Sequence, residues 1–174
     1  MAVGVEIRAL SREELDAVTG ALPGLPFAPV SKHLLRLHLQ EEAGACYLVA
    51  WRGNEPVGHA LVHLRPNSDQ GAVLGCAELE DLFVRPDARG LGVGVALLAA
   101  AEIEAAGAGA DQVGFAVTVS NPRNDAARRL YERCGYRDAG LGEFNTGYTY
   151  WDEDGQPHRH EESHRYLCKR LAVT

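Results

Sequence analysis

The sequence has few of the features that mark metal-rich, secreted or membrane-spanning proteins. Its four cysteines, Cys46, Cys76, Cys134 and Cys168, lie far apart and form no C-x-x-C pair, which argues against a zinc ribbon or a thioredoxin-like redox site. No run approaches the ~18 apolar residues of a membrane-spanning helix, and the start, MAVGVEIRAL, does not resemble a secretory signal. We therefore expect a cytoplasmic protein with reduced thiols and no membrane partner.

Positive charge is also scarce. The 174 residues include 17 Lys and Arg against 24 Asp and Glu, which gives a net charge of −7. A generic nucleic-acid-binding protein usually carries a basic stripe, so we expect no nucleic-acid partner. A cationic partner suits an acidic surface better. The length fits one domain over residues 1–174, and it leaves a homodimer open.

The hydrophobic pattern predicts antiparallel hairpins followed by a strand–helix–strand–helix order. Cys76–Val119 fits one crossover that joins two parallel strands, and Gly53-Asn54 is a hairpin signal between two apolar runs. We thus expect one α/β domain with a mixed sheet. The expected strands are 5–10, the two arms of 46–65, 76–84, 111–120, about 143–151 and about 162–171, and the expected helices are 11–22, 31–42, 88–108 and 124–135. We expect turns at 68–71 and at Asp154-Gly155.

A glycine-rich turn, Arg89-Gly90-Leu91-Gly92-Val93-Gly94, follows the strand that ends at Val84. The first backbone N–H groups of a helix have no internal partner and lie at the positive end of its dipole, so they suit a phosphate. Glycines remove the Cβ atoms that would keep a phosphate away. The alternative is a tight connection that lets the helix pack closely on the sheet. The spacing fits neither a Walker A loop nor a Rossmann fingerprint.

Two spaced motifs extend this observation. Arg89, Gly92 and Gly94 match the pattern Q/R-x-x-G-x-G/A after a strand, and NDAARRLYERCGY at 124–136 matches N-x-x-A-x-x-L-Y-E-x-x-G-F/Y. Together, over about residues 76–136, they resemble the GNAT superfamily of N-acetyltransferases. The resemblance implies a mixed, mostly antiparallel sheet, flanked by helices, whose central parallel strand pair splays around the cofactor.

The resemblance also implies acetyl-CoA as the acyl donor. Backbone groups of Leu82, Phe83 and Val84 would bind the pantetheine arm. The family's Asn position, here Asn124, would touch the cofactor, with Asn121 as a rival, and Tyr131 would lie near the sulfur and protonate the leaving thiolate. The N–H groups that would hold the pyrophosphate belong to Arg89, Gly90, Leu91, Gly92, Val93, Gly94 and Val95.

Three carboxylates interrupt the apolar strand ELEDLFV. In a regular strand Glu78 and Glu80 share a face with Leu82 and Val84, while Asp81 faces the other way. An attacking amine must lose a proton, and burial raises the pKa of a carboxylate towards the range useful for a base. The family commonly places its base on this strand. We assign Glu80, with Glu78 and Asp81 as alternatives and His63 in reserve. The competing interpretation pairs these acids with arginines.

The segment HRHEESH, with Cys168 beyond it, contains ligand types that suit zinc. On one continuous strand, however, His160 and Cys168 would lie ~27 Å apart. We therefore predict no metal site. The acidic residues around Asp154-Gly155 are expected to be solvated, or to attract cationic substrates if that hairpin borders the acceptor site.

The leading hypothesis is an acetyl-CoA-dependent acyltransferase that acetylates a primary amine, most simply a small molecule, with Glu80 as base and Tyr131 as acid. One alternative keeps the reaction and changes the acceptor to a protein α-amino group or lysine. The other is an acyl-CoA-binding module with little catalysis, which Tyr131 and the carboxylate-bearing strand argue against.

Overall fold

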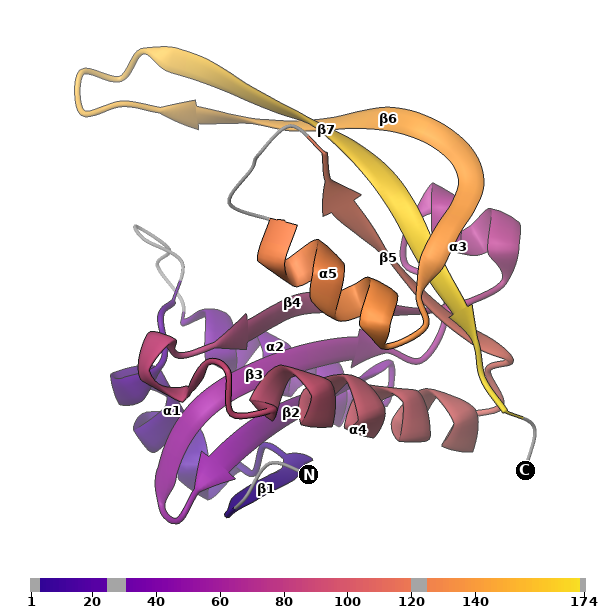
Figure 1. Cartoon of the computed structure of the whole chain (residues 1–174). Helices are drawn as coiled ribbons and strands as arrows, with labels where there is room; N and C mark the ends of the chain where they lie inside the picture. The colour runs from indigo at the N-terminus through magenta and orange to yellow at the C-terminus, as the bar shows by residue number, and fades with distance from the viewer. Residues whose placement is uncertain (1–3, 25–30, 120–124, 173–174) are drawn as a thin grey trace. The chain divides into compact units, whose positions relative to one another are not determined.

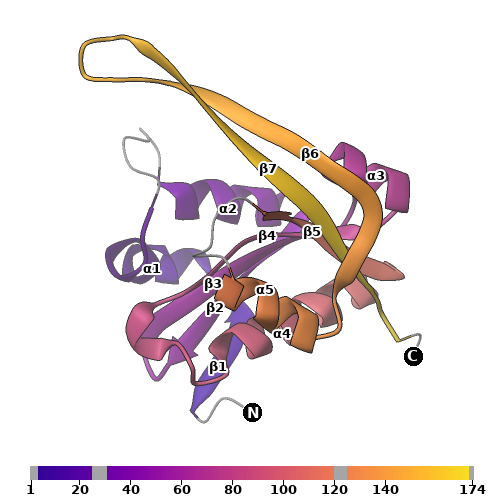
Figure 2. The same ribbon diagram turned by 45° about the horizontal axis from the view of Figure 1, so that its top comes forward.

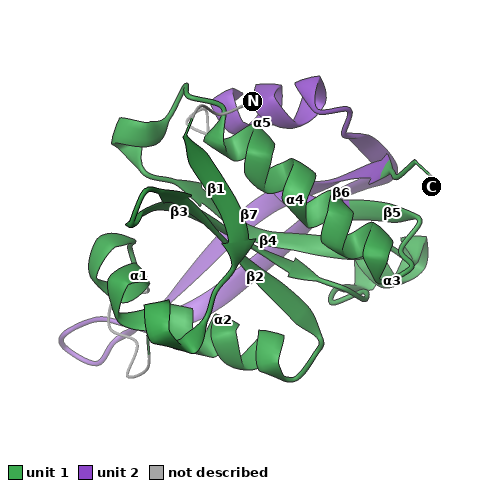
Figure 3. Ribbon diagram, turned by 90° about the horizontal axis from the view of Figure 1, so that it is seen from below, with its two compact units in different colours: residues 1–113, 170–174 green, residues 114–169 purple. Residues whose placement is uncertain are grey.

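The computed structural model describes residues 4–24, 31–119 and 125–172 (Figure 1). Seven strands form one sheet in the order β1-β2-β3-β4-β5-β7-β6, with helices flanking it. Among the strands of the described residues, only the β4–β5 pair is parallel. This confirms the predicted fold class of an α/β protein with a mostly antiparallel sheet and one central parallel pair. The chain divides into two compact units, residues 1–113 with 170–174 and residues 114–169, which Figure 3 distinguishes by colour.

The first unit contains four consecutive antiparallel strands, β1 (Val5–Ala9), β2 (Ala45–Arg52), β3 (Glu55–His63) and β4 (Ala77–Val84). The predicted hairpin at Gly53-Asn54 is confirmed, since Gly53 has a φ of 61° between β2 and β3. The helices of this unit are η1 (Arg12–Glu14), α1 (Leu15–Ala21), α2 (Lys32–Glu41), α3 (Asp69–Leu74), η2 (Pro86–Ala88) and α4 (Val93–Gly107). No helix among the described residues is long and apolar enough to cross a membrane.

Both faces of this four-stranded sheet are covered (Figures 1 and 3). On one face Tyr47 and Trp51 of β2 share a core with Val18 of α1 and Leu37 of α2. On the other face α4 crosses the strands so closely that a Cβ on Gly58 would lie 3.3 Å from the Leu97 side chain. The sheet therefore holds β4 and the start of α4 in fixed positions within this unit.

Two local predictions are corrected here. The turn expected at 68–71 is instead the start of α3, because Ser68 accepts a hydrogen bond from Gly71 N at 3.0 Å and Gly75 ends the helix in the left-handed conformation. The helix expected from residue 88 begins only at Val93. Before it, Pro86 opens a short 3-10 turn, and the glycines at 90 and 92 have positive φ values that an α-helix does not allow.

The second unit contains most of β5 (Gln112–Thr118), with α5 (Asp125–Arg133), β6 (Arg137–Trp151) and β7 (Pro157–Arg170). β6 and β7 form a longer ribbon than the sequence predicted. β6 ends at Trp151 as expected but begins at Arg137 instead of about Glu143, and β7 begins at Pro157 instead of about Glu162. Just beyond β5, the N–H of Val119 donates to Ser163 O of β7 at 2.9 Å. Figure 2 shows the β6–β7 ribbon extending beyond β5.

Candidate active site

The glycine turn has the geometry expected of an anion-binding helix N-terminus. Gly90 and Gly92 have φ values of 75° and 82°, and Gly92 is the N-cap of the 15-residue helix α4. No side chain caps this end, and the Gly92 carbonyl accepts its first helical bond from Ala96 N at 3.0 Å. The N–H groups of Val93, Gly94 and Val95 therefore have no partner within the helix. A Cβ on Gly90 would meet no atom within 4 Å, so there is room for a side chain at this position. Glycine is favoured at position 90 by the positive φ of the backbone and not by close packing.

Arg89 joins this turn to the end of β4. Its Nε donates to the Val84 carbonyl at 2.9 Å, and its guanidinium carbon lies 5.9 Å from the centre of the Phe83 ring. The side chain is exposed and makes no ion pair with a described residue. It therefore adds one positive charge beside the α4 N-terminus, where an anion would be favoured.

A β-bulge interrupts β4 among the three acids. Glu80 pairs with Leu61 of β3 and Phe83 pairs with His59, so two residues of β4 stand opposite one of β3. Asp81 takes a φ of 58°, a left-handed conformation that aspartate tolerates better than most residues. The predicted alternation of Glu78 and Glu80 with Leu82 and Val84 is therefore wrong beyond residue 80. The bulge brings Phe83 onto the His59 face, where the rings stack at 5.6 Å.

Glu78 is committed to the loop that precedes α3. Its carboxylate accepts the backbone N–H of Ser68 at 2.7 Å and that of Asn67, and only 6% of the residue is exposed. A Cβ on Gly71 would overlap this carboxylate, so the helix and the acid fit together closely. These contacts describe an acid that holds a loop, with little access for a substrate.

Glu80 is the most exposed of the three acids, with 40% of its side chain accessible. His63 Nε2 lies 2.7 Å from Oε2, and Arg36 Nη2 of α2 lies 2.7 Å from Oε1. The hydrogen bond from His63 and the charge of Arg36 outweigh the effect of burial and hold the pKa of Glu80 below its usual range. The expectation that burial would raise this pKa is therefore wrong, because the carboxylate has two cationic or hydrogen-bonding partners.

Asp81 does not face away from Glu80, as regular alternation predicted. The bulge turns its carboxylate towards α2, where Lys32 Nζ lies 2.9 Å from Oδ2. Arg36 Nη2 lies 3.9 Å from the same oxygen, and so does His59 Nδ1. Glu80 and Asp81 thus share a polar cluster with two cations of α2.

The α2 side of this cluster was not predicted from the sequence. Lys32 and Arg36 are four residues apart, so the predicted helix 31–42 already placed them on one face. That spacing was the available signal, but it did not indicate which strand the face would meet. Their partners on β4 became evident only once the fold brought α2 over the bulge.

A group of buried aromatic and imidazole rings lies beneath the acids. His33 Nδ1 lies 2.7 Å from the Tyr47 hydroxyl, and burial lowers the pKa of His33 and raises that of Tyr47. His59 is fully buried, and neither ring nitrogen has a hydrogen-bond partner in the described structure. Desolvation lowers the pKa of His59 to about 4. The ring is therefore neutral at physiological pH.

Tyr131 lies on α5 in the second unit. Its ring meets Phe115 of β5 edge to face, with 4.5 Å between ring centres. Desolvation raises the pKa of the Tyr131 phenol, so its proton is held at neutral pH. The rival asparagines, Asn121 and Asn124, lie outside the described residues.

The second unit also contains a pocket of about 620 Å³ lined by α5 and the β5, β6 and β7 strands. Its walls include Val117, Arg128 and Glu132, together with the cross-strand pair Arg165 and Glu143, whose charged atoms lie 3.1 Å apart. None of the described residues predicted for catalysis or cofactor binding lines this pocket.

Comparison with known proteins agrees with this geometry. Residues 13–136, which include both acetyltransferase motifs, match the Acetyltransferase (GNAT) family. The chain belongs to the GNAT acetyltransferase family. It is accordingly an acetyl-CoA-dependent acyltransferase. No curated protein sequence matches the chain.

Solved structures of GNAT acetyltransferases share the fold at low sequence identity. An N-acetyltransferase from Staphylococcus aureus Mu50 has a TM-score of 0.67 at 16% identity, over 97% of this chain and 99% of the other. The ribosomal-protein-S18-alanine N-acetyltransferase from Escherichia coli has a TM-score of 0.64 at 20% identity, over 98% and 96%. A GNAT family acetyltransferase from Elizabethkingia anophelis, solved with acetyl-CoA bound, has a TM-score of 0.59 at 16% identity, over 97% and 99%.

Proposed function

We propose that this enzyme transfers an acetyl group from acetyl-CoA to the primary amine of a small molecule. The observation that carries the proposal is Glu80, an ionised and accessible carboxylate on the bulged strand that leads into the glycine turn. Residues 13–136 match the family across both compact units, so we also propose that residues 1–174 form one acetyltransferase domain. The cytoplasmic location stays a prediction.

The α4 N-terminus fits the cofactor's pyrophosphate. We propose that the N–H groups across Arg89–Val95 hold it, with the Arg89 side chain adding positive charge. Backbone groups of Leu82, Phe83 and Val84 would bind the pantetheine arm, although the Val84 carbonyl already accepts a bond from Arg89. Asn124 remains a predicted contact. When bound, acetyl-CoA supplies the acetyl thioester that the amine attacks.

Glu80 would accept the proton that the amine loses as its nitrogen bonds to the acetyl carbon. Its lowered pKa makes it a weak base, so direct transfer from a free alkylammonium, which is mostly protonated at pH 7, is uphill. The carboxylate would nevertheless bind and orient the ammonium. Attack begins from the neutral amine, after the ammonium has released one proton to solvent, and Glu80 would accept the second proton once the new C–N bond makes it acidic. His63 Nε2, which lies 2.7 Å from Glu80 Oε2, would keep its hydrogen bond to the Glu80 carboxyl group during this transfer.

Tyr131 would supply the proton that the sulfur takes up as the C–S bond breaks. The raised pKa keeps the phenol protonated until a strong base such as a thiolate develops beside it. Contact with Phe115 restricts the ring, which helps to position the hydroxyl. The products are a neutral amide and a free thiol. Glu80 is then protonated and Tyr131 is deprotonated, and exchange of one proton with solvent at each group restores the starting state.

A protein α-amino group or lysine remains the alternative acceptor. The structural neighbours include the E. coli ribosomal-protein-S18-alanine N-acetyltransferase. At 20% identity this similarity supports a shared fold and does not support a shared acceptor. A non-catalytic acyl-CoA-binding module is disfavoured by an accessible Glu80 and a protonated Tyr131.

The test is an acceptor screen that reads thiol release from acetyl-CoA. Polyamines, aminoglycosides and alanine-initiated peptides should be compared at equal concentration, with mass spectrometry of each product. We expect turnover with at least one small amine and little with peptides. Turnover confined to peptides would favour the alternative acceptor, and cofactor binding without turnover on any amine would favour the binding module.

A further inference from the structure

The outer part of the β6–β7 ribbon, residues 146–162, is a two-stranded surface. The hydrogen bond from Val119 N to Ser163 O is the last described contact between β5 and β7 before this segment. Cross-strand pairing nevertheless continues from Thr146 opposite Glu162 to Trp151 opposite Pro157. We call residues 146–162 the distal ribbon. Isolated two-stranded ribbons are marginally stable in water, so the length of this one calls for an explanation.

Aromatic side chains are concentrated on the distal ribbon although nothing in the described structure covers them. Tyr148, Tyr150 and Trp151 are 62%, 48% and 66% exposed. On one face the Tyr148 ring lies 5.3 Å from His160, and Tyr150 stacks on His158 at the same distance. These cross-strand ring pairs hold the tyrosines in place, which gives a rigid surface of the kind that is enriched at protein interfaces.

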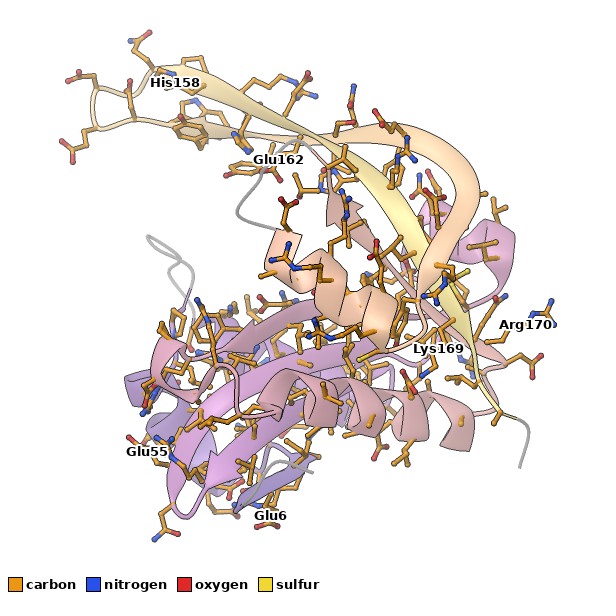
Figure 4. The ribbon with its side chains drawn as sticks, viewed as in Figure 1. Glu6, Glu55, His158, Glu162, Lys169 and Arg170 are labelled. Carbon is orange, nitrogen blue, oxygen red and sulfur yellow. The ribbon has the colours of Figure 1, made fainter. Side chains whose placement is uncertain are left out.

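The same segment is strongly acidic. It contains five carboxylates, those of Asp152, Glu153, Asp154, Glu161 and Glu162, against the single cation Arg159. Arg159 is itself paired with Glu161 at 2.7 Å, while His158 lies 2.7 Å from Asp152. Glu153 and Asp154 form no ion pair with a described residue. Figure 4 labels His158 and Glu162 on this ribbon.

We propose that the distal ribbon is a docking surface for an extended, cationic segment of another protein. Exposed tyrosines and a tryptophan bind arginine and lysine side chains through cation–π contacts, and nearby carboxylates add charge complementarity. β6 is the last strand in the sheet order, so its outer backbone groups are available to pair with an extended chain.

Charge disfavours the other occupants. A second copy of this chain would bring a like-charged ribbon against the first, in a protein whose net charge is already −7. An anionic membrane surface would be repelled for the same reason. The docking proposal goes beyond acetyl transfer and does not depend on the identity of the acceptor amine.

The experiment uses a short fluorescent peptide of alternating arginine and threonine, blocked at both ends. Arginine is not an amine acceptor of the proposed reaction, so binding is measured separately from catalysis. Fluorescence anisotropy with the full-length protein should show binding that weakens as salt is raised. The matched peptide with glutamate in place of arginine should not bind.

The variants assign the binding to the ribbon. Tyr148→Thr combined with Tyr150→Thr keeps strand-forming residues and should weaken binding at least about tenfold. Glu153→Gln combined with Asp154→Asn should weaken binding and reduce its salt dependence. Val73→Thr removes an apolar residue that is 74% exposed on α3 and should leave binding unchanged. The melting temperature of each variant shows whether it remains folded.

Three outcomes of the binding measurements would overturn the proposal. They are an absence of binding by the unaltered protein, equal binding by the folded tyrosine variant, and equal binding of the glutamate peptide. Sedimentation should also be measured, because a dimer that the tyrosine substitutions dissociate would identify a second copy as the occupant and exclude the cationic partner.

Discussion

Arg36 Nη2 of α2 lies 2.7 Å from Oε1 of Glu80 on β4, and 18% of the arginine side chain is exposed. The proposed base is therefore also the partner of a largely buried cation. The two interpretations that the sequence left open, catalytic base and arginine partner, describe the same side chain. Experiments on Glu80 must separate its effect on stability from its effect on proton transfer.

Glu80→Gln should lower both activity and stability, by different mechanisms. Glutamine cannot accept the amine's proton, so kcat/KM should fall by ~10²–10⁴ at neutral pH and recover in part at higher pH, where more free amine is present. Loss of the charge beside Arg36 should cost about 1–3 kcal/mol in free energy of unfolding, since the pair is only partly buried. The pH–rate profile and denaturant unfolding measure these two effects.

The stability effect of Glu80→Gln has a predictable pH dependence. The folded-state pKa of Glu80 lies below its ordinary value of 4.5, so ionised Glu80 stabilises the fold above that pH. This contribution is lost as pH falls through the folded pKa. The stability difference between the two proteins should thus shrink under acidic conditions. Reduced stability with an unaltered pH–rate profile would contradict the role of Glu80 as the base.

Glu78→Gln should lower stability without changing the pH dependence of the reaction. Its carboxylate holds the backbone N–H groups of Asn67 and Ser68, so losing one acceptor oxygen should destabilise the protein by about 1–3 kcal/mol. The shape of the pH–rate profile should stay the same, because Glu78 is buried in loop contacts. A change in that profile without loss of stability would move the base assignment from Glu80 to Glu78.

Gly92→Asp and Gly92→Asn form a matched pair for the anion site. Both residues tolerate the left-handed conformation found at Gly92, and they have almost the same shape, but only aspartate carries a negative charge. Acetyl-CoA should raise the melting temperature of the unaltered protein and, to a smaller extent, that of Gly92→Asn. It should not raise that of Gly92→Asp. Equal shifts in the two variants would place the phosphates elsewhere.

The sequence was sufficient to predict the fold class and the glycine turn because both depend on local signals. Strand and helix order follow from hydrophobic periodicity, and the positive φ values of Gly90 and Gly92 are conformations that glycine adopts readily. Helix α3 was missed, although Ser68 and Gly75 are ordinary capping residues, because only six residues separate them. Short helices give too little periodicity to be distinguished from turns.

The arrangement of the acids could not be predicted from β4 alone. A bulge has no strong signature when its left-handed residue is aspartate, and one extra residue changes the face of every side chain beyond it. Glu80 and Asp81 are also defined by Lys32 and Arg36, which lie more than forty residues earlier in the chain. Their pairing, and with it the lowered pKa of Glu80, depends on tertiary contacts.

Tyr131→Phe should remove the proposed acid with little change in the fold. The ring keeps its contact with Phe115, so the melting temperature and the affinity for acetyl-CoA should barely change. kcat should fall by ~10²–10⁴ if proton donation limits the rate. Because the pKa of Tyr131 is raised, the unaltered enzyme should retain its phenol proton throughout the neutral range. Near-normal turnover by the variant would show that Tyr131 only packs against Phe115.

His59→Phe should make the protein more resistant to acid. His59 has a folded pKa of about 4 against an ordinary value of 6.5, so between these pH values the unfolded chain binds a proton that the folded chain does not. Stability conferred by neutral His59 is therefore lost progressively as pH falls from 6.5 towards 4. Phenylalanine has a similar shape, cannot be protonated, and sacrifices no described hydrogen bond. Relative to the unaltered protein, the variant should gain about 1–3 kcal/mol in free energy of unfolding over this interval.

Denaturant unfolding at several pH values measures this gain in stability. The control is His38→Gln, a change at an exposed histidine of α2. Parallel stability curves for His59→Phe and the unaltered protein would show that His59 is protonated in the folded state as readily as in the unfolded chain.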